Sequence, residues 1–372
     1  MQKQFFYILP HKNYFFQGEG GAVTHAIGIL KGLKKNGIKI KLVADSNGIN
    51  NFEEINNVLL IDLNQVKGFK RYNKIIQLMN ENRNSIFIIR KHFLFLLFYS
   101  IIVRSRYNVI WEINGLSFEK FDGKPVINIL YKFLMLVNKI LLKSSKGKIY
   151  TITPKLKEIL ATGIFALKNE NIVVIENGCS NIKEIEKVTD KTVTFLFYGK
   201  FNYYNDYDLV IKAFNVIQKK EKNIKLLFVG FGPYAQRLKE MISINGNKSI
   251  QISSPANINV LYNKFVKGKR VFGLIPMKNL DSLKYTSPIK LYDYSGMNIP
   301  IIHSSSTFVK SKSKAFFEYD AKSYISLAEK MGKCINIKNY NELQNISHTF
   351  AKNNSWGNKM KILIDFIQNP EC

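Results

Sequence analysis

Residues 286–303 read TSPIKLYDYSGMNIPIIH, a stretch that combines a helix start with a buried strand. Ser287 and Pro288 predict a helix with Pro288 at its first position, because the N–H that proline lacks would be unsatisfied there. Such a helix start directs free N–H groups at an anion. Asp293, about one and a half turns further on, could accept both hydroxyls of a ribose. The apolar run at 299–303 predicts the next strand.

The same alternation of short apolar strands and helical segments extends along the whole chain and predicts an α/β fold. We expect two Rossmann-like domains facing a central cleft. Residues 1–180 would form the first domain, completed by a C-terminal crossing helix at 355–372, and residues 181–354 would form the second. The expected strands lie at 5–10, 38–44, 58–63, 85–90, 109–113, 148–152 and 172–176, then at 193–199, 224–230, 249–253, 271–276 and 299–303.

Composition narrows the classes of protein. The chain has 372 residues, 46% of them hydrophobic, which excludes global disorder. No segment reaches the roughly 18 uninterrupted apolar residues of a spanning helix, and the first residues are too quickly polar for a signal peptide. Three scattered cysteines indicate a reducing, cytoplasmic setting. The net charge of +28 indicates nucleic acid, a membrane surface or a mere compositional preference for lysine, and its even spread argues against a nucleic-acid groove.

Residues 92–148 are unusually apolar and also basic. In the apolar stretch 126–142 and just after it, lysines recur at spacings that share one helix face, and an apolar run at 93–103 precedes them. A basic stripe on an apolar helix is typical of a helix lying on an anionic membrane surface. The alternative is a core helix whose lysines point to solvent. The lysines concerned are Lys132, Lys139, Lys143 and Lys146.

Two candidate sites precede residue 180. Small residues at Gly20 and Gly21 let a ligand approach the backbone at a helix start, with Glu19 and His25 beside them. A lone histidine at such a position more often has a packing role than a catalytic one. At the end of the strand at 109–113, Glu112 and Asn114 face the edge where open α/β sheets bind ligands; a plain Asn-Gly turn is the alternative.

Further candidates follow residue 190. Lys200, directly after Gly199, places a cation at a strand end, where it suits a diphosphate. Gly230 and Gly232 form a tight turn that would admit a flat base, although either site could be structural. Asp206-Tyr207-Asp208 looks like a metal motif, but aspartates are ordinary at a helix start. We therefore expect no metal.

Ser287-Pro288-Ile289-Lys290-Leu291-Tyr292-Asp293-Tyr294 resembles the donor-site segment of glycosyltransferase family 4, whose members are retaining GT-B enzymes. Other landmarks of that family follow in the same order, and the resemblance spans nearly the whole chain. They are Gly20-Gly21 with His25, Glu112-Ile113-Asn114-Gly115, Glu176-Asn177-Gly178, Gly199-Lys200, Gly230-Phe231-Gly232-Pro233 and Ser355-Trp356.

The resemblance implies transfer of a hexose or N-acetylhexosamine from a nucleotide sugar, most often UDP-linked, with retention and without a further cofactor. The acceptor would be a saccharide or a polyprenyl-linked sugar in surface polysaccharide or glycolipid synthesis, at the cytoplasmic face of the membrane. Donor-binding positions are Gly20, Gly21, Gly199, Lys200, Asn205, Gly230, Gly232, Ser287, Pro288, Ile289, Lys290 and Asp293. Acceptor-binding positions are Glu19, His25 and Asn114, and catalytic positions are His25, Glu112, Lys200 and Lys290.

Two positions depart from the family. Tyr285 stands where a donor-binding glutamate is usual, and Asn205 stands where a phosphate-binding lysine is usual. If the enzyme inverts instead, it needs a general base, for which Glu19, His25 and Glu112 are the candidates. A non-catalytic nucleotide-sugar-binding subunit and, more remotely, a nucleic-acid-binding protein are the alternatives.

Overall fold

The computed structural model describes residues 4–11, 21–47, 58–103, 107–115, 125–254, 257–280, 283, 285–307, 309 and 313–368, with the backbone alone for 125–131. The chain forms two compact units. The first unit is Met1–Asn177 with Trp356–Cys372, and the second unit is Gly178–Ser355. Among the described helices, none is long and apolar enough to cross a membrane.

The first unit is built on a parallel sheet in the order β3-β2-β1-β4-β5-β6-β7. Its strands are β1 (Phe5–Ile8), β2 (Ile40–Ala44), β3 (Leu59–Asp62), β4 (Ile86–Arg90), β5 (Asn108–Ile113), β6 (Lys148–Thr151) and β7 (Ile172–Val174). Its helices are α1 (Gly21–Lys35), α2 (Phe69–Glu81), α3 (Phe93–Ile102), α4 (Pro125–Ser145), α5 (Pro154–Ala161), the turn η4 (Asn169–Asn171) and α12 (Trp356–Gln368).

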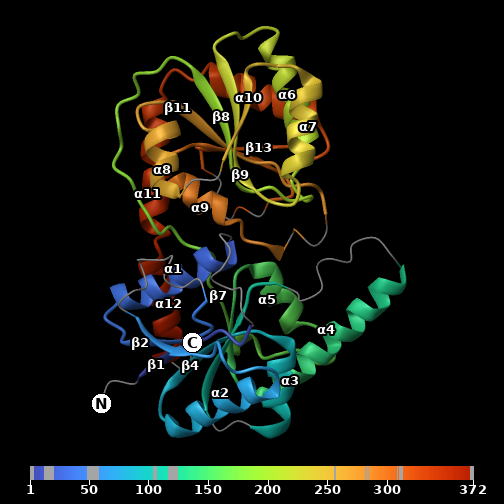
Figure 1. Cartoon of the computed structure of the whole chain (residues 1–372), viewed down its shortest axis with the longest axis vertical. Coiled ribbons are helices and arrows are strands. Elements are labelled where there is room, and N and C mark those ends of the chain that lie inside the picture. The colour runs from blue at the N-terminus through green and yellow to red at the C-terminus, as the bar shows by residue number, and fades with distance from the viewer. Residues whose placement is uncertain are drawn as a thin grey trace. The chain divides into compact units, whose positions relative to one another are not determined.

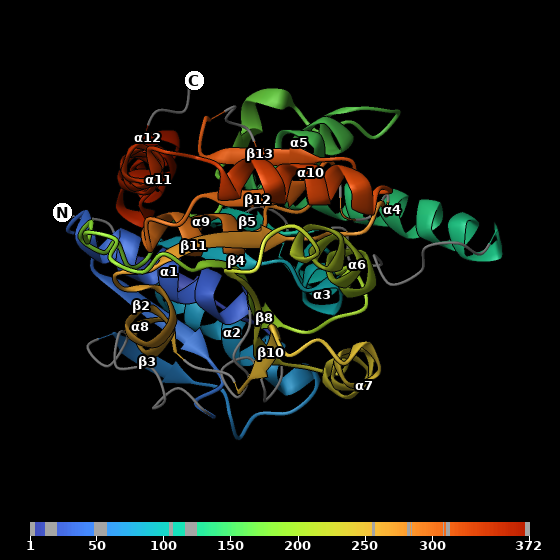
Figure 2. The same cartoon turned by 90° about the horizontal axis from the view of Figure 1, so that it is seen from above.

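Both faces of this sheet are covered by helices (Figure 1). Successive residues of a strand point to opposite faces, so Phe5 and Tyr7 of β1 join the core formed with α1 and α12. On the opposite face, Trp111 of β5 contacts Phe95 and Tyr99 of α3. Helix α4 packs on α3 and extends away from the sheet in both views (Figure 1 and Figure 2).

Helix α12 belongs to the first unit although it ends the chain. It lies against α1, where Gly28 leaves room for the Trp356 ring: a β-carbon on residue 28 would lie 2.1 Å from the indole. Trp356 also meets the His25 ring edge-on, with ring centroids 5.1 Å apart. This contact fixes the C-terminal helix beside the carboxyl end of β1.

The second unit repeats the architecture with a parallel sheet in the order β10-β9-β8-β11-β12-β13. Its strands are β8 (Val193–Lys200), β9 (Ile224–Phe231), β10 (Ile250–Ser253), β11 (Arg270–Ile275), β12 (Ile301–Ser304) and β13 (Phe316–Tyr319). Its helices are α6 (Tyr207–Gln218), α7 (Ala235–Asn245), α8 (Ile258–Leu261), the turn η5 (Tyr262–Val266), α9 (Ile289–Gly296), α10 (Tyr324–Ile335) and α11 (Tyr340–Asn353).

This sheet also has a core on each face, because the side chains of β8 alternate. Phe195 and Phe197 pack with helices α6 and α10, whereas Leu196 packs with α9. Figure 1 shows α6, α7 and α10 on one side of the sheet and α8, α9 and α11 on the other. The predicted fold class, α/β with two parallel Rossmann-like sheets, is therefore confirmed.

Four local features differ from the expectations. Helix α9 begins at Ile289, because Pro288 has an extended ψ of 118° and precedes the helix. Strand β13 was not expected. Lys146 does not extend the lysine stripe, since α4 ends at Ser145 and Lys146 has a positive φ of 50°. Lys139 is also not directed at solvent alone, because its Nζ donates to the Thr162 carbonyl at 2.6 Å.

Candidate functional site

In the second unit, the start of α9 lies against the end of β8. The Lys290 side chain passes over Gly199, so that a β-carbon on residue 199 would lie 3.1 Å from Lys290 Cε and 3.3 Å from Nζ. The same ammonium lies 4.9 Å from the centre of the Phe197 ring. Two motifs that are about ninety positions apart in the sequence, Gly199-Lys200 and the Ser287–Asp293 segment, therefore share one surface.

Tyr294 fixes this arrangement. Its hydroxyl donates to the Leu196 carbonyl at 3.0 Å and accepts from the Tyr198 N–H at 2.8 Å. Its ring occupies the space that Gly273 of β11 leaves open. Because Tyr294 is fully buried, these bonds tie α9 to β8 and β11. They also hold in place Lys290, in the first turn of the same helix, and Asp293, at the start of its second turn.

Burial shifts the pKa values of Lys290 and Asp293, and the charge of each group opposes the shift of the other. Burial lowers the pKa of Lys290 from 10.5 to about 8, which the charge of Asp293 opposes. Burial likewise raises the pKa of Asp293 from 3.8 to about 7, which Lys290 opposes. Among the described residues, neither group makes a hydrogen bond or an ion pair. A cation and a carboxylate held in this way are suited to a ligand that carries both an anion and hydroxyl groups.

The rest of the predicted donor-binding segment surrounds this pair. Ile289 is the first residue of α9, and no side chain caps the helix, so its first N–H groups are available to an anion. Ser287 is buried and Pro288 is half-buried just before it. Lys200 is exposed at the end of β8. The site thus combines one half-buried cation, one exposed cation and one helix start.

The backbone geometry at the ends of β8 and β9 by itself explains why glycines stand there. Gly199 has a φ of +122°, which other residues rarely adopt. Gly230 is its partner across the strands, and a β-carbon there would lie 1.9 Å from the Gly199 carbonyl oxygen. At Gly232 a β-carbon would lie 2.4 Å from the Phe201 carbonyl oxygen. The chain's own backbone therefore requires glycine at these positions.

Asn205 and Asp206 have structural partners. Asn205 is buried, and its amide donates to the Tyr207 hydroxyl at 3.2 Å. Asp206 caps α6 by accepting from the Leu209 N–H at 3.1 Å. Asp208 forms an exposed pair with Lys212 one turn on. Within the described residues, no group of three or more potential ligands could hold a metal ion.

The first unit contains a buried charge cluster around Glu112. The Tyr7 hydroxyl donates to Glu112 Oε2 at 2.7 Å, and the Asn114 amide donates to Oε1. His25 Nε2 lies 3.1 Å and Arg90 Nη1 lies 3.5 Å from the same oxygen. Burial alone raises the pKa of Glu112, but the charges of Arg90 and His25 outweigh it and lower the pKa from 4.5 to about 2.

This cluster brings together three of the sequence-predicted residues. Glu112 is fully buried and remains ionised, so it takes up protons poorly near neutral pH. His25 is held on its other side by Asn177, with 2.5 Å between Nδ1 and Oδ1. Gly21 is the exposed first residue of α1, while Glu19 and Gly20 lie outside the described residues. The arrangement holds His25, Arg90 and Asn114 in fixed positions at the carboxyl edge of the sheet.

Sequence reasoning missed four residues of these clusters. Tyr7, Arg90 and Tyr150, whose hydroxyl lies 3.2 Å from His25 Nε2, lie in strands that the sequence indicates only as apolar core. Tyr294 looks in the sequence like one more aromatic residue of a helix. Polar atoms inside apolar runs are the available signal, since a buried hydroxyl or guanidinium needs a partner. The partner itself lies on another strand, so the sequence does not reveal it.

Comparison with known proteins supports this geometry. Residues 180–309 match the family model "Glycosyl transferases group 1", and this segment contains the whole Gly199, Lys290 and Asp293 surface. A glycosyltransferase from Rickettsia africae matches with a TM-score of 0.72 at 16% identity, over 99% of this chain and 98% of that one. This chain has the GT-B fold.

Two further GT-B structures align over almost their full length. Anabaena HepE, solved with UDP and glucose, matches with a TM-score of 0.69 at 12% identity, over 98% of this chain and 99% of that one. The lipopolysaccharide outer core galactosyltransferase WaaB matches with a TM-score of 0.68 at 13% identity, over 98% and 99%. No curated protein matches the sequence. At these identities, the likeness to solved structures establishes the GT-B fold.

Proposed function

We propose that this protein is a retaining hexosyltransferase of the family 4 type, which uses a UDP sugar and acts in surface polysaccharide or glycolipid synthesis. The surface formed by Gly199, Lys290 and Asp293 carries the proposal, because it lies within the segment that matches group 1 glycosyltransferases. The name of WaaB, a lipopolysaccharide galactosyltransferase, and the UDP and glucose bound to HepE support the donor and the process.

The donor diphosphate would lie at the start of α9. Lys290 and the N–H groups of the first helical turn are placed to neutralise it. Asp293, about one turn into the helix, would accept hydrogen bonds from the ribose hydroxyls through its carboxylate. Lys200 is exposed at the neighbouring strand end and would stabilise the charge that grows on the departing diphosphate.

Calorimetric titration with UDP tests this proposal. Wild-type protein should bind UDP, and Asp293→Ala should lose about 1.5–3 kcal/mol, or about 10- to 150-fold in affinity. Asp208→Ala is the matched control, since Asp208 is an exposed aspartate of the same unit that forms a surface ion pair with Lys212. Equal affinities of Asp293→Ala and wild type would remove Asp293 from the donor site, and no UDP binding at all would overturn the proposed function.

Turnover distinguishes an enzyme from a non-catalytic subunit, the alternative raised by Tyr285 and by the Asn205–Tyr207 hydrogen bond. Slow hydrolysis of UDP-glucose, UDP-galactose or UDP-N-acetylglucosamine, measured by the appearance of free UDP, would demonstrate catalysis. The anomeric configuration of the released sugar, read by NMR before mutarotation, distinguishes retention from inversion. Binding of UDP without any release of sugar would favour the non-catalytic subunit.

We further propose that the first unit binds the acceptor, with Asn114 and His25 at its carboxyl edge. Glu112 then serves as a positioning residue, because it is buried and fixes Tyr7, His25 and Arg90. Its depressed pKa makes it a weak general base at neutral pH.

We also propose that helices α3 and α4 lie on the cytoplasmic face of an anionic membrane. The α3–α4 face, as we call it, exposes apolar side chains of both helices, with Ile101 68% and Phe133 59% exposed. Lys132 and Lys143 are exposed along the adjoining stripe of α4. The α3–α4 face comprises Leu94, Ile101, Ile102, Phe133, Leu136 and Ile140.

Liposome co-sedimentation tests the membrane proposal. Two exposed lysines contribute about 1 kcal/mol each near an anionic surface, so Lys132→Gln with Lys143→Gln should weaken binding about 30-fold at low salt. The control carries the same charge change on exposed lysines of the second unit, Lys212→Gln with Lys267→Gln. Equal binding of all three proteins, or no binding by wild type, would contradict the proposal.

A further inference from the structure

A second group of titratable side chains lies at the carboxyl edge of the first unit's sheet. His11 follows β1, and His92 follows β4 and precedes α3. The two rings meet edge to face with centroids 4.9 Å apart, and both residues are half-buried. His92 Nδ1 lies 3.3 Å from the Tyr72 hydroxyl of α2. Two imidazoles from neighbouring strands are thus held in contact.

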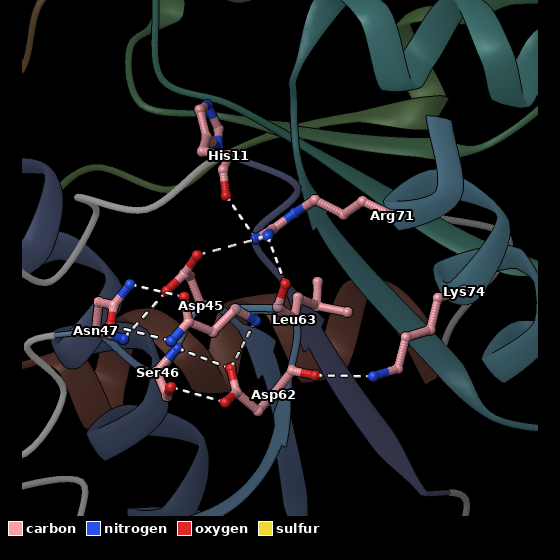
Figure 3. A network of polar contacts seen from close by, with 9 residues as sticks. His11, Asp45, Ser46, Asn47, Asp62, Leu63, Arg71 and Lys74 are labelled. Carbon is pink, nitrogen blue, oxygen red and sulfur yellow. Dashed lines mark hydrogen bonds and ion pairs between the residues drawn. The ribbon is translucent and has the colours of Figure 1, made fainter. Parts of the chain in front are cut away.

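Two arginines flank this histidine pair. Arg71 of α2 is buried and donates to the His11 and Leu63 carbonyls, at 2.6 and 3.0 Å, with Asp45 at 3.6 Å (Figure 3). It therefore ties together the ends of β1, β2 and β3. Among the described residues, its buried Nε has no acceptor. Arg90 at the end of β4 retains 14% exposure of its side chain.

The electrostatics of the pair are unusual for packing residues. Burial, and then the charges of Arg90 and His92, lower the pKa of His11 from 6.5 to about 3, with Glu112 opposing and Arg71 adding to the shift. Burial and the charge of Arg71 lower the pKa of His92. The groups that face the pair are thus Arg71, Arg90, Glu112 and Tyr72. An oxyanion bound beside the two rings, which are already in contact with each other, would oppose these shifts and draw protons onto the rings.

Helix α3 adds an apolar surface that begins at the same point. No acidic residue lies in its first turn, and the His92 side chain does not cap it. Further along, Leu94, Ile101 and Ile102 are exposed. A ligand with an anionic head at the start of α3 and an apolar chain along it would match both features.

We propose that the first unit binds a phosphate group of the acceptor between His11, Arg90 and His92. Arg71 acts as a positioning residue, since its guanidinium reaches backbone carbonyls and Asp45 rather than the ligand. The inference rests on the proposed function in one respect only, namely that the bound phosphate belongs to an acceptor. The phosphate could belong to a lipid phosphate or to a soluble sugar phosphate, and the two share this chemistry.

Histidine NMR of the full chain tests the site directly. The chain has five histidines, so His11→Gln and His92→Asn assign the two ring signals. Inorganic phosphate, added with UDP present to occupy the donor site, should shift both signals and raise both apparent pKa values by at least one unit. The affinity for sulfate, which does not titrate between pH 4 and 8, should fall at least fivefold over that range as the two rings lose their protons.

Variants define the contribution of each group. His92→Asn should weaken phosphate binding at least tenfold, and His11→Gln should do the same. Lys74→Gln is the control, because Lys74 is an exposed cation of α2 whose Nζ donates to the Asp62 carbonyl. Tryptophan fluorescence reports whether each variant is folded, since Trp111 and Trp356 both lie in the first unit. If His11→Gln does not fold, His92→Asn, which keeps a residue favoured before helices, decides.

Comparing the affinities of two ligands distinguishes a lipid phosphate from a soluble sugar phosphate. Dodecyl phosphate binding at least tenfold tighter than glucose 1-phosphate indicates a lipid phosphate, and the reverse order indicates a soluble sugar phosphate. Dodecyl maltoside binding as tightly as dodecyl phosphate would overturn the proposal, as would unshifted His11 and His92 signals at 50 mM phosphate. UDP affinity of the second unit is measured in the same samples, so loss of UDP binding counts against the proposed function alone.

Discussion

The Lys290 side chain of α9 lies against Gly199 of β8. The position of the ammonium that would hold the donor diphosphate therefore depends on the absence of a side chain at residue 199. Because of this contact, a side chain added at residue 199 would displace Lys290.

Gly199→Ala should therefore affect both binding and stability. The new β-carbon would lie 3.1 Å from Lys290 Cε at a φ of +122°, and such backbone strain costs about 1–3 kcal/mol. We expect UDP affinity to fall about tenfold and thermal unfolding to shift down. The control is Gly332→Ala in α10, where nothing lies within 4 Å of the new carbon; it should gain about 0.4–1 kcal/mol and keep its UDP affinity.

Donor affinity should depend on pH through Asp293 and Lys290. Asp293, with a pKa of about 7, can offer both oxygens as full acceptors to the two ribose hydroxyls only when ionised, so UDP affinity should rise from pH 5.5 to 7. Lys290, with a pKa of about 8, loses its proton above that value, so affinity should fall again. UDP affinity of Asp293→Asn should not show the rise that is due to Asp293. Any rise that remains in this variant comes from titration of the UDP phosphate itself. Parallel curves for the two proteins would contradict the assignment.

Folding stability should follow the same pair with a defined sign. The folded-state pKa of Asp293 is raised, so the folded protein holds a proton that the unfolded chain has released between about pH 4 and 7. Stability from this group is therefore present below pH 4 and is lost as pH rises to 7. Urea unfolding at pH 5 and pH 7.5 should show Asp293→Asn gaining on wild type at the higher pH.

Lys200→Ala and Lys290→Ala should differ in kinetic signature. Lys200 is exposed at the strand end, and we expect its loss to lower kcat more than it raises KM, because charge grows on the diphosphate as it leaves. Lys290→Ala should chiefly weaken UDP binding. A raised KM with unchanged kcat in Lys200→Ala would make Lys200 a ground-state contact only.

Glu112→Gln should destabilise the first unit strongly. Removing one partner of a buried ion pair costs about 3–5 kcal/mol, and tryptophan fluorescence reports this unit alone. Because the pKa of Glu112 is depressed to about 2, its contribution is present above pH 4.5 and is lost as pH falls through 2. Glu158→Gln, which breaks an exposed pair with Lys155, should cost less than about 1 kcal/mol.

Local patterns predicted most of the fold. The Ser287-Pro288 helix start and the strand at 299–303 correspond to α9 and β12, and the alternating apolar runs correspond to strands on both sheets. The misses were local as well. Strand β13 is only four residues long and follows a stretch rich in serine and lysine, so it lacks a clear apolar run with turn residues on both sides.

The charge cluster could not be predicted in the same way. Tyr7, Arg90 and Glu112 are far apart in the sequence and meet because β1, β4 and β5 are neighbours in the sheet. Strand order decides this, and periodicity does not encode it. The Lys290 contact with Gly199 is likewise a consequence of β8 and β11 pairing beneath α9.

The position of α12 affects how the chain can fold during synthesis. Trp356 fills the space beside Gly28, yet residues 178–355 emerge from the ribosome between these two positions. At about 5–20 residues per second, the delay is roughly ten to forty seconds. During that time the α1 residues that pack against α12 lack their partner, while the second unit, which is continuous in sequence, can already fold. We therefore expect the nascent first unit to need chaperones until α12 has been synthesised.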